Sequence, residues 1–407
     1  MTTLDPTTTA LDSLFNSFVR RDDSYRGLFD QDEYADVADF YGARPALSPT
    51  PLRSLSGLAD ESGLGGLLVK DETGRFGLEA FKIAGARYAM ARIGPDRLRT
   101  GVVCATAGNH GRAVARSARE VGVACTIYLP APPADAHDLE LATRRGRVAA
   151  MQSDGATTVE VAGSYEASVA RAAEHARASG AIVVSDTSWP GYDEIPRLIM
   201  IGYTQLFQEA SSQWDHPPDL VLIQGGVGGL VCAAANWFAA RYGPDRPLLI
   251  SCEPDSAACL LESARAGRLV NLAAMTPDRD PRTPGGDSGV SEPQAPGVES
   301  SAPRPEPRQG STLMAGLRCA QPSPAAWPSI QFGIDAFLSI PDSLAIEAMD
   351  RLSHPAHGDR AIAAGPSGAC GIGALLGLLR SPAMNTIKIR CGASRSTRVM
   401  AVVTEGP

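Results

Sequence analysis

The stretch Lys70-Asp-Glu-Thr-Gly-Arg-Phe-Gly-Leu-Glu-Ala-Phe-Lys-Ile-Ala-Gly85 places one lysine, Lys82, at the junction of a strand and a helix. The mostly apolar run 66–70 is typical of a short buried strand, and the glycine-bearing segment 73–77 of a turn. Residues 80–93 are good helix formers. We therefore expect Lys82 in the first turn of a helix, near the end of a strand.

A lysine at that position is electrostatically unfavourable, because the N-terminal end of a helix carries a partial positive charge. Deprotonation or covalent modification of the amine would explain its presence, and a Schiff base with pyridoxal phosphate is one such use. The alternative is an ordinary surface lysine on an amphipathic helix. Taken alone, the stretch favours that alternative, because single motifs often match by chance.

Composition excludes several classes of function. The chain has 407 residues, 44% of them hydrophobic, so it can bury a large core and is long enough for two lobes or several domains. A net charge of -8 provides no basic surface for nucleic acid or for an anionic membrane. The most apolar run, 369–379, is too short to span a bilayer, and the first residues lack the features of a signal peptide. We expect a cytoplasmic protein that acts on small molecules.

Strand and helix patterns alternate along most of the chain. The first series of predicted strands comprises residues 102–106, 124–129, 156–161 and 181–185. The second series comprises residues 219–224, 247–252 and 398–403. Alternation with helical segments predicts mostly parallel sheets that are flanked by helices, in two α/β lobes. Ligands in such folds lie at the carboxyl ends of the strands.

Two segments depart from this pattern. Residues 1–45 are polar and acidic, and we expect an arm that packs only in part. Residues 276–310 are rich in Pro, Gly, Ser and charged residues and have almost nothing apolar, which predicts a disordered insertion. The insertion is either a genuine flexible loop or a misread coding segment, and the sequence fits both.

The motif Ala105-Thr-Ala-Gly-Asn-His-Gly111 lies between a predicted strand and a predicted helix. Small residues and backbone N–H groups at such a place can close over a flat ligand. Asn109 can donate a hydrogen bond to a phenolate oxygen, such as the 3′-oxygen of a pyridoxal ring. Asn109 fits the N-cap of the following helix equally well.

A second motif, Gln224-Gly-Gly-Val-Gly-Gly229, occupies the corresponding position in the second series. Its glycines leave backbone N–H groups accessible, and a phosphate at the N-terminus of the next helix needs that access. The chain lacks the lysine and hydroxyl residue of a P-loop after these glycines, so a monophosphate fits better than a nucleotide. A tight packing turn is the alternative.

In their order these motifs resemble those of the pyridoxal-phosphate enzymes with the tryptophan-synthase β-subunit fold, called fold type II. The elements that carry the resemblance are Arg75-Phe-Gly-Leu-x-Ala-Phe-Lys82, Thr106-x-Gly-Asn-His-Gly111, Gly225–Gly229 and Thr404-Glu-Gly406. Within this fold type the chain is most similar to the diaminopropionate ammonia-lyases. Agreement with that family extends to Asp186–Tyr192, Ile195-Pro196, Glu253-Pro254, Thr312–Leu317 and Ser367–Ala369.

The resemblance implies pyridoxal 5′-phosphate as the cofactor. It implies that Lys82 binds the cofactor covalently, that Asn109 meets the 3′-oxygen and that Thr404 faces the pyridine nitrogen. The residues implied to hold the phosphate are Gly225, Gly226, Val227, Gly228 and Gly229.

On the substrate side, Asp186 is implied to bind the distal ammonium group and to act in catalysis together with Lys82. The other residues implied to line the substrate pocket are Thr106, Ala107 and Tyr165. Asp186 could instead cap the next turn, and Tyr165 could be an aromatic residue at a helix start.

The reaction implied is the α,β-elimination of 2,3-diaminopropionate to pyruvate and two ammonia, through an aminoacrylate. The resemblance also implies a homodimer. Residues 1–90 and 195–407 would form the large cofactor-binding lobe, and residues 91–194 the small lobe.

The sequence departs from the family pattern in three ways. Ala107 replaces an aspartate expected to serve as base for the D-isomer, which predicts a preference for the L-isomer. Pro366 replaces a glutamate beside the ring. The chain stops at Pro407, soon after the last strand, so we expect that strand to be poorly anchored.

Eight cysteines are spread along the chain without a Cys-x-x-Cys pair, which indicates neither a zinc site nor a disulfide scaffold. Cys259 and Cys319 occupy stretches that are neighbours in the family fold. They would form either a regulatory disulfide or, as a reducing compartment favours, two buried free thiols.

Two other functions compete with the ammonia-lyase. A serine/threonine dehydratase-like eliminase agrees with Ala107, whereas Asp186 and Trp189-Pro-Gly-Tyr192 speak against it. The other is a catalytically impaired paralogue that binds the cofactor, or nothing, without turnover.

Overall fold

The structure is a computed structural model of the chain, and it describes residues 11–22, 25, 27–106, 108–132, 138–163, 165–275, 312–355 and 358–407. Ala107 and the predicted insertion at 276–310 lie outside the described residues.

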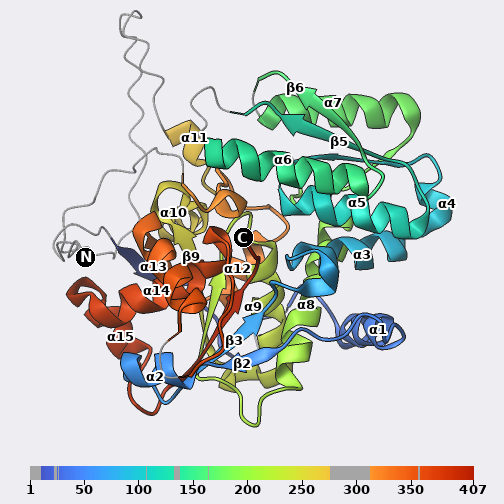
Figure 1. Ribbon diagram of the computed structural model, residues 1–407. Coiled ribbons are helices and arrows are strands. Elements are labelled where there is room, and N and C mark those ends of the chain that lie inside the picture. Colours follow the sequence, from blue (N-terminus) through green and yellow to red (C-terminus); the bar gives the residue numbers. More distant parts are fainter. Residues whose placement is uncertain are drawn as a thin grey trace, which may run out of the picture.

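The larger of two sheets has seven strands (Figure 1). In spatial order they are β1 (Asp12–Phe15), β10 (Ala336–Ile340), β9 (Leu248–Pro254), β8 (Leu220–Gln224), β11 (Arg398–Val403), β3 (Gly66–Asp71) and β2 (Leu52–Ser54). The five inner strands run parallel, and the edge strands β1 and β2 are antiparallel to their neighbours. All five residues of β8 are buried, as expected for a parallel strand covered on both faces.

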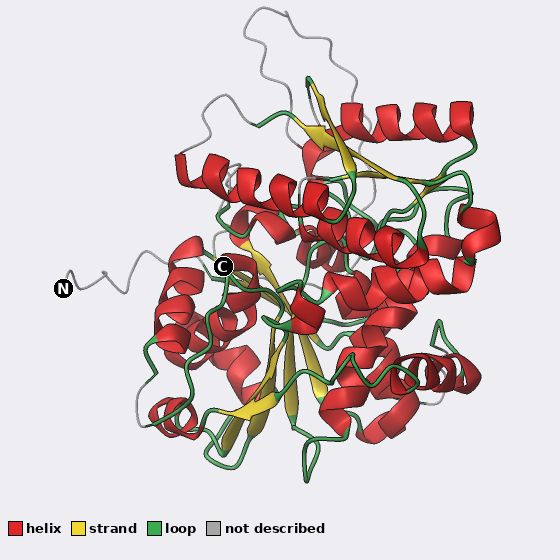
Figure 2. Ribbon diagram, turned by 45° about the vertical axis from the view of Figure 1, so that its right-hand side comes forward, coloured by secondary structure: helices red, strands yellow, loops and turns green. Residues whose placement is uncertain are grey.

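The smaller sheet has four parallel strands. In spatial order they are β6 (Thr157–Val161), β5 (Cys125–Pro130), β4 (Val102–Ala105) and β7 (Ile182–Val183). The helices between these strands are α5 (Asn109–Val121), α6 (Asp138–Ser153) and α7 (Tyr165–Ser179). Figure 2 shows this unit above the larger sheet.

Helices cover both faces of the larger sheet, where side chains alternate between two hydrophobic cores. One core includes residues of α2 (Ser56–Ser62), α13 (Asp342–Ser353), α14 (Pro366–Arg380) and α15 (Asn385–Arg390). The opposite core includes residues of α1 (Gln31–Gly42), α8 (Glu194–Ser211), α9 (Gly229–Tyr242), α10 (Cys259–Ala266), α12 (Trp327–Gly333) and α4 (Pro95–Leu98), with α11 (Leu272–Met275) beside them. The prediction of two mostly parallel sheets flanked by helices is confirmed.

Helix α3 (Lys82–Ile93) links the two units because it packs against both α5 and α8 (Figure 1). Two glycines allow the close contact with α8. A Cβ on Gly85 would lie 2.6 Å from the carbonyl oxygen of Ile199, and a Cβ on Gly202 would lie 2.9 Å from that of Ala84. The helix that begins with Lys82 is therefore fixed between the two sheets, although the lobe boundaries at 90 and 194 stay a prediction.

Two expectations about the ends of the chain were wrong. The described part of residues 1–45 does not form a loosely packed arm, because β1 completes the larger sheet and α1 buries four large side chains. The last strand is not poorly anchored either. β11 lies in the middle of the sheet between β8 and β3, and the N–H of Gly406 donates to the carbonyl oxygen of Glu79 at 2.9 Å.

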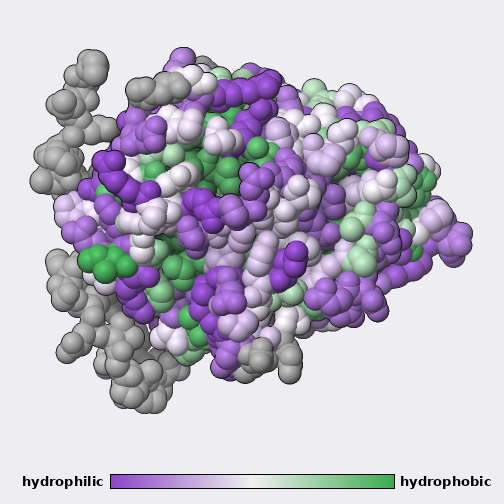
Figure 3. Space-filling model, turned by 90° about the horizontal axis from the view of Figure 1, so that it is seen from below, coloured by the Kyte–Doolittle hydropathy of each residue, from purple (hydrophilic) through white to green (hydrophobic). Residues whose placement is uncertain are grey.

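Polar and charged residues cover most of the face seen in Figure 3, with apolar residues in scattered patches. Among the described residues, no helix is both long enough and apolar enough to cross a membrane.

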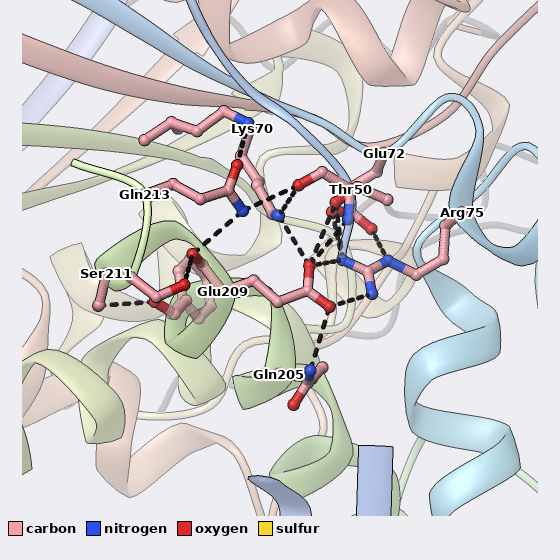
Figure 4. Close-up of polar contacts among 11 residues, drawn as sticks. Thr50, Lys70, Glu72, Arg75, Gln205, Glu209, Ser211 and Gln213 are labelled. Carbon is pink, nitrogen blue, oxygen red and sulfur yellow. Dashed lines mark hydrogen bonds and ion pairs between the residues drawn. The ribbon is translucent and has the colours of Figure 1, made fainter. Parts of the chain in front are cut away.

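A buried charged cluster connects the start of the β3–α3 turn to α8 (Figure 4). The Glu209 carboxylate accepts hydrogen bonds from Lys70 Nζ at 2.7 Å and from Arg75 Nη2 at 2.6 Å. Glu72 accepts a second bond from the same Arg75 Nη2 at 2.7 Å, and Thr50 Oγ1 donates to Glu72 at 2.5 Å. Two cations and two carboxylates thus neutralise one another out of contact with water.

The pKa of Glu209 depends on its two cationic partners. Burial alone would raise the pKa of this carboxyl group, but Arg75 and then Lys70 hold it below its ordinary value. The folded state therefore binds a proton at Glu209 less readily than the unfolded chain. This contribution to stability is complete above the unfolded pKa of about 4.3 and is lost as the pH falls through the folded value.

We predict that Glu209→Gln lowers the free energy of unfolding by about 3–5 kcal/mol, because it leaves two buried cations with one carboxylate. Urea unfolding at neutral pH measures this. Glu194→Gln is the matched control, because Glu194 forms an exposed ion pair with Arg97, for which about 1 kcal/mol or less is expected. Similar losses in the two variants would contradict the prediction.

Candidate active site

Lys82 is the first residue of α3, as the sequence predicted, and the turn before it has an unusual backbone. Phe76 and Glu79 have φ angles of 48° and 66°, a region that residues other than glycine rarely adopt. The N–H of Phe81 donates to the carbonyl oxygen of Thr404 at 3.0 Å, directly after β11. Lys82 is therefore held at the carboxyl ends of β3 and β11.

Lys82 and Asp186 form an ion pair across the two units. The distance from Lys82 Nζ to Asp186 Oδ2 is 2.5 Å, and both side chains are largely buried. Burial opposes the charge on Lys82, but Asp186 outweighs it and raises the pKa of Lys82 above its ordinary range. Burial likewise opposes the charge on Asp186, and Lys82 still holds the pKa of Asp186 below its ordinary value.

His110 faces the same carboxylate, and the sequence analysis gave it no role. Its Nε2 lies 3.1 Å from the carbonyl oxygen of Val184, which identifies Nε2 as the protonated nitrogen. Nδ1 lies 3.8 Å from Asp186 Oδ2, is buried and has no hydrogen-bond partner. Burial lowers the pKa of His110, so the ring is neutral and presents a lone pair toward Asp186.

Asn109 is the first residue of α5, and Gly108 is the N-cap, so the N-cap alternative for Asn109 is wrong. The Asn109 amide donates to the carboxylate of Glu405, a buried residue of the segment after β11 that the sequence analysis quoted without a role. Thr106 accepts a hydrogen bond from the N–H of Gly108 at 3.1 Å, which shapes the same turn.

The glycine segment after β8 forms a tight loop that ends at the N-terminus of α9. Gly228 has a φ of 94°, a backbone conformation that residues other than glycine rarely adopt, and a Cβ there would also displace Ile330 Cδ1. No hydrogen bond to another described residue is found for the N–H groups of Gly226, Gly228 and Gly229. The loop is therefore a tight packing turn, and anion binding by its N–H groups stays a prediction.

Two serine residues tie the loop of Asp186 to this glycine loop. The N–H of Ser188 donates to Ser323 Oγ at 3.0 Å, and the N–H of Ser323 donates to the carbonyl oxygen of Val227 at 2.8 Å. Ser188 Oγ in turn accepts from the N–H of Ala325 at 2.8 Å. Sequence reasoning missed this connection because the two serines are 135 positions apart.

The remaining predicted residues differ in how closely they approach Lys82. Thr404 is buried beside Phe81, whereas Tyr165 begins α7 and is 48% exposed. Desolvation and the Asp186 carboxylate raise the pKa of Tyr165, which indicates that its hydroxyl faces the same region.

Cys259 and Cys319 lie on two sides of Gly226. Cys259 Sγ donates to the Gly226 carbonyl oxygen at 3.5 Å, and Cys319 Sγ would be 3.3 Å from a Cβ on Gly226. Both thiols are free in this structure, Cys259 buried and Cys319 partly buried, and the choice between a regulatory disulfide and free thiols stays a prediction. Burial raises the pKa of Cys319 to about 12, so its thiol stays protonated.

These groups fit pyridoxal phosphate. Unpaired N–H groups at the start of α9 suit a phosphate, the amine of Lys82 suits an aldehyde, and the Asn109 amide suits a ring oxygen. Among the described residues, no cluster of His, Cys, Asp and Glu could hold a metal ion.

Comparisons with known proteins agree with this geometry. The sequence pattern of the family "Pyridoxal-phosphate dependent enzyme" matches residues 43–387. The chain is 30% identical over 400 residues to a diaminopropionate ammonia-lyase of Escherichia coli K12, covering 93% of this chain and 89% of that protein. A threonine dehydratase of Mycobacterium leprae is 26% identical over 231 residues, which cover 56% of this chain and 49% of that enzyme.

A solved structure of the Escherichia coli diaminopropionate ammonia-lyase, in complex with an aminoacrylate–pyridoxal phosphate azomethine, superimposes with a TM-score of 0.81. It is 29% identical and covers 98% of this chain and 94% of its own. The predictions of fold type II and of pyridoxal 5′-phosphate as cofactor are confirmed. The chain belongs to the pyridoxal-phosphate dependent enzymes and, within them, to the family of the diaminopropionate ammonia-lyases.

Proposed function

We propose that the protein eliminates ammonia from L-2,3-diaminopropionate and yields pyruvate and two ammonia. The observation that carries this proposal is the Asp186 carboxylate, which is 2.5 Å from Lys82 and remains ionised in a largely buried site. An anion at this place matches a substrate with a second ammonium group. A hydroxyl-bearing amino acid gives it no such partner.

When bound, pyridoxal phosphate supplies an electron sink for the negative charge at the substrate α-carbon. Lys82 is proposed to be both the point of covalent attachment and the base that takes the α-proton. As a base it must be neutral, whereas its ion pair with Asp186 keeps it protonated. The substrate resolves this conflict if its distal ammonium takes the place of Lys82 beside Asp186. Burial then lowers the pKa of Lys82 with less opposition, because the ion pair with Asp186 is gone.

Asp186 also controls the leaving group. A β-nitrogen departs readily as ammonia only while it carries three protons, because its bonding pair then returns to a positively charged atom. The low pKa of Asp186 keeps this carboxylate from removing one of those protons. His110 Nδ1 offers a second acceptor on the same side, 3.8 Å from Asp186 Oδ2, so one ammonium group can bind to both.

Water is the only further reactant that the remaining steps need. Lys82 holds the α-proton, the C–N bond breaks with its electron pair going to nitrogen, and the released aminoacrylate takes up water to give pyruvate and the second ammonia. Asn109 and the N–H groups of residues 226–229 are proposed to orient the cofactor, and Thr404 to face its ring nitrogen.

Dehydration of serine or threonine is the second candidate. The partial match to a threonine dehydratase favours it, and Asp186 opposes it. The impaired-paralogue alternative rests in part on Pro366, which the structure places at the first position of α14, where proline is favourable.

We also propose a homodimer in the cytoplasm. All eight cysteines are free thiols, which suits a reducing compartment, and the resemblance to the family supports the dimer.

The chain contains only three lysines, Lys70, Lys82 and Lys388, so the attachment site can be identified directly. We predict that borohydride reduction of the protein with pyridoxal phosphate, followed by peptide mapping, labels Lys82. Lys70 is completely buried in the charged cluster and serves as an internal control. Label on Lys388 in place of Lys82 would refute the assignment.

The proposed reaction is tested by pyruvate release from L- and D-2,3-diaminopropionate, with L-serine and L-threonine alongside. We predict turnover of the L-isomer and little or none of the D-isomer, because Ala107 has no carboxylate to serve as the opposite base. Preference for L-threonine would establish the second candidate. Absence of pyruvate from all four, with the cofactor bound, would establish the paralogue without turnover.

Asp186→Asn should separate the two kinds of substrate. We predict a loss of roughly 10- to 100-fold in kcat/KM for L-diaminopropionate, the value of one charge-assisted hydrogen bond, and a smaller change for any activity toward L-serine. Lys82→Ala should abolish turnover of both. An equal loss for both substrates in Asp186→Asn would contradict the binding of the distal ammonium by Asp186.

The same variant tests the electrostatics of the ion pair. Because Asp186 raises the pKa of Lys82, Asp186→Asn should lower it, and Lys82 should react with pyridoxal phosphate at a lower pH than in the wild type. The rate of cofactor attachment as a function of pH measures this. Asp193→Asn, an exposed neighbour in the same segment, should leave the profile unchanged. A shift to higher pH in Asp186→Asn would overturn the prediction.

A further inference from the structure

The side chain of Tyr203, on α8, packs between α3 and the start of α9. A Cβ on Gly85 would lie 2.5 Å from Tyr203 Cε1, and a Cβ on Gly229 would lie 3.4 Å from Cε2. These two carbons flank the one that bears the hydroxyl group. The hydroxyl therefore projects between the first turn of α3 and the first residue of α9.

By strict hydrogen-bond geometry this hydroxyl has no partner among the described residues, although Tyr203 is completely buried, and the Lys82 amine is close enough to interact with it. The amine of Lys82 lies 5.8 Å from the centre of the Tyr203 ring and donates its short hydrogen bond to Asp186. A buried hydroxyl without a partner is costly and requires an explanation, and a ligand is a specific explanation for Tyr203 because this hydroxyl lies between Lys82 and the N-terminus of α9.

The groups around the hydroxyl define the chemistry of that molecule. The N–H groups of Gly228 and Gly229, at the N-terminus of α9, have no hydrogen bond to another described residue. All of them are donors. Burial raises the pKa of Tyr203, so its hydroxyl is a donor too. An acceptor with several oxygens and a negative charge, such as a phosphate, would satisfy these N–H groups and the hydroxyl together.

We propose that the Tyr203 hydroxyl donates a hydrogen bond to a phosphate group held at the N-terminus of α9. This rests on the proposed placement of the cofactor phosphate at residues 225–229 and adds to it a side-chain ligand from α8.

The test compares Tyr203→Phe with wild type, and inorganic phosphate is the first probe. Equilibrium dialysis with the cofactor-free protein gives the phosphate Kd, and pyridoxal phosphate is then titrated in a Lys82→Ala background, where covalent attachment cannot mask the contribution of the phosphate. We expect both Kd values to rise roughly 10- to 100-fold, the value of a hydrogen bond to a charged group.

Tyr34→Phe is the matched control. Tyr34 is also buried with a hydroxyl that lacks a partner, but it packs against Trp237, with 5.3 Å between the ring centres. Removal of the Tyr34 hydroxyl should leave both Kd values unchanged. Without ligand, Tyr203→Phe should melt at or above the wild-type temperature, because it removes an unsatisfied group and keeps the ring.

Three results would overturn the inference. Wild-type affinity in Tyr203→Phe, or an equal loss in Tyr34→Phe, would refute the Tyr203 contact and leave the proposed function intact. A lower melting temperature of ligand-free Tyr203→Phe would show a structural role instead. If wild type bound neither phosphate nor the cofactor, the proposed function itself would fail, and the inference with it.

Discussion

The position of Lys82 depends on the buried carboxylate of Glu209. The turn between β3 and α3 contains Phe76 and Glu79 in left-handed conformations, which cost of order 1–3 kcal/mol each and persist only where surrounding structure enforces them. Glu209, on α8, forms ion pairs with Lys70 and Arg75, which precede this strained segment. Removing one ion from the cluster leaves the others unpaired in a dry environment, so the cluster forms as a whole. That arrangement gives the lysine a fixed support instead of a flexible loop.

The groups around Lys82 are segregated by hydrogen-bonding type. The start of α9 presents N–H donors and Tyr203 a hydroxyl that can donate, whereas Asp186 and His110 Nδ1 present acceptors. A phosphate-bearing ring and a diamino acid bound side by side match this division. Lys82 lies between the donors and the acceptors, and in the proposed reaction it is the group that changes partner. Its affinity for protons is therefore set by whatever occupies Asp186, which couples substrate recognition to the strength of the base.

Local pattern was sufficient to predict most of the fold. Apolar strands separated by helical segments predicted β5, β8 and α3 close to their observed ends, because burial of a parallel strand and helix periodicity are both encoded by near neighbours. β1 and α1 were missed because the segment is polar. The capping box of Asp30 and Glu33 was the available signal for α1. The central position of β11 was also missed, since the strand order in a sheet depends on tertiary pairing that no local pattern shows.

Site residues were predictable only where they lie within a recognisable sequence motif. Lys82, Asn109 and the glycine loop lie in recognisable stretches, but their partners come from far along the chain: Asp186 is 104 positions from Lys82, and Glu405 is 296 positions from Asn109. Tyr203 shows the limit most clearly. In the sequence it is an aromatic residue on an apolar helix, which is the usual description of a core side chain. Its ring does pack in the core. Only the three-dimensional arrangement shows that its hydroxyl is left without a partner where Lys82 and the start of α9 converge, and a group of that kind is accounted for by a ligand.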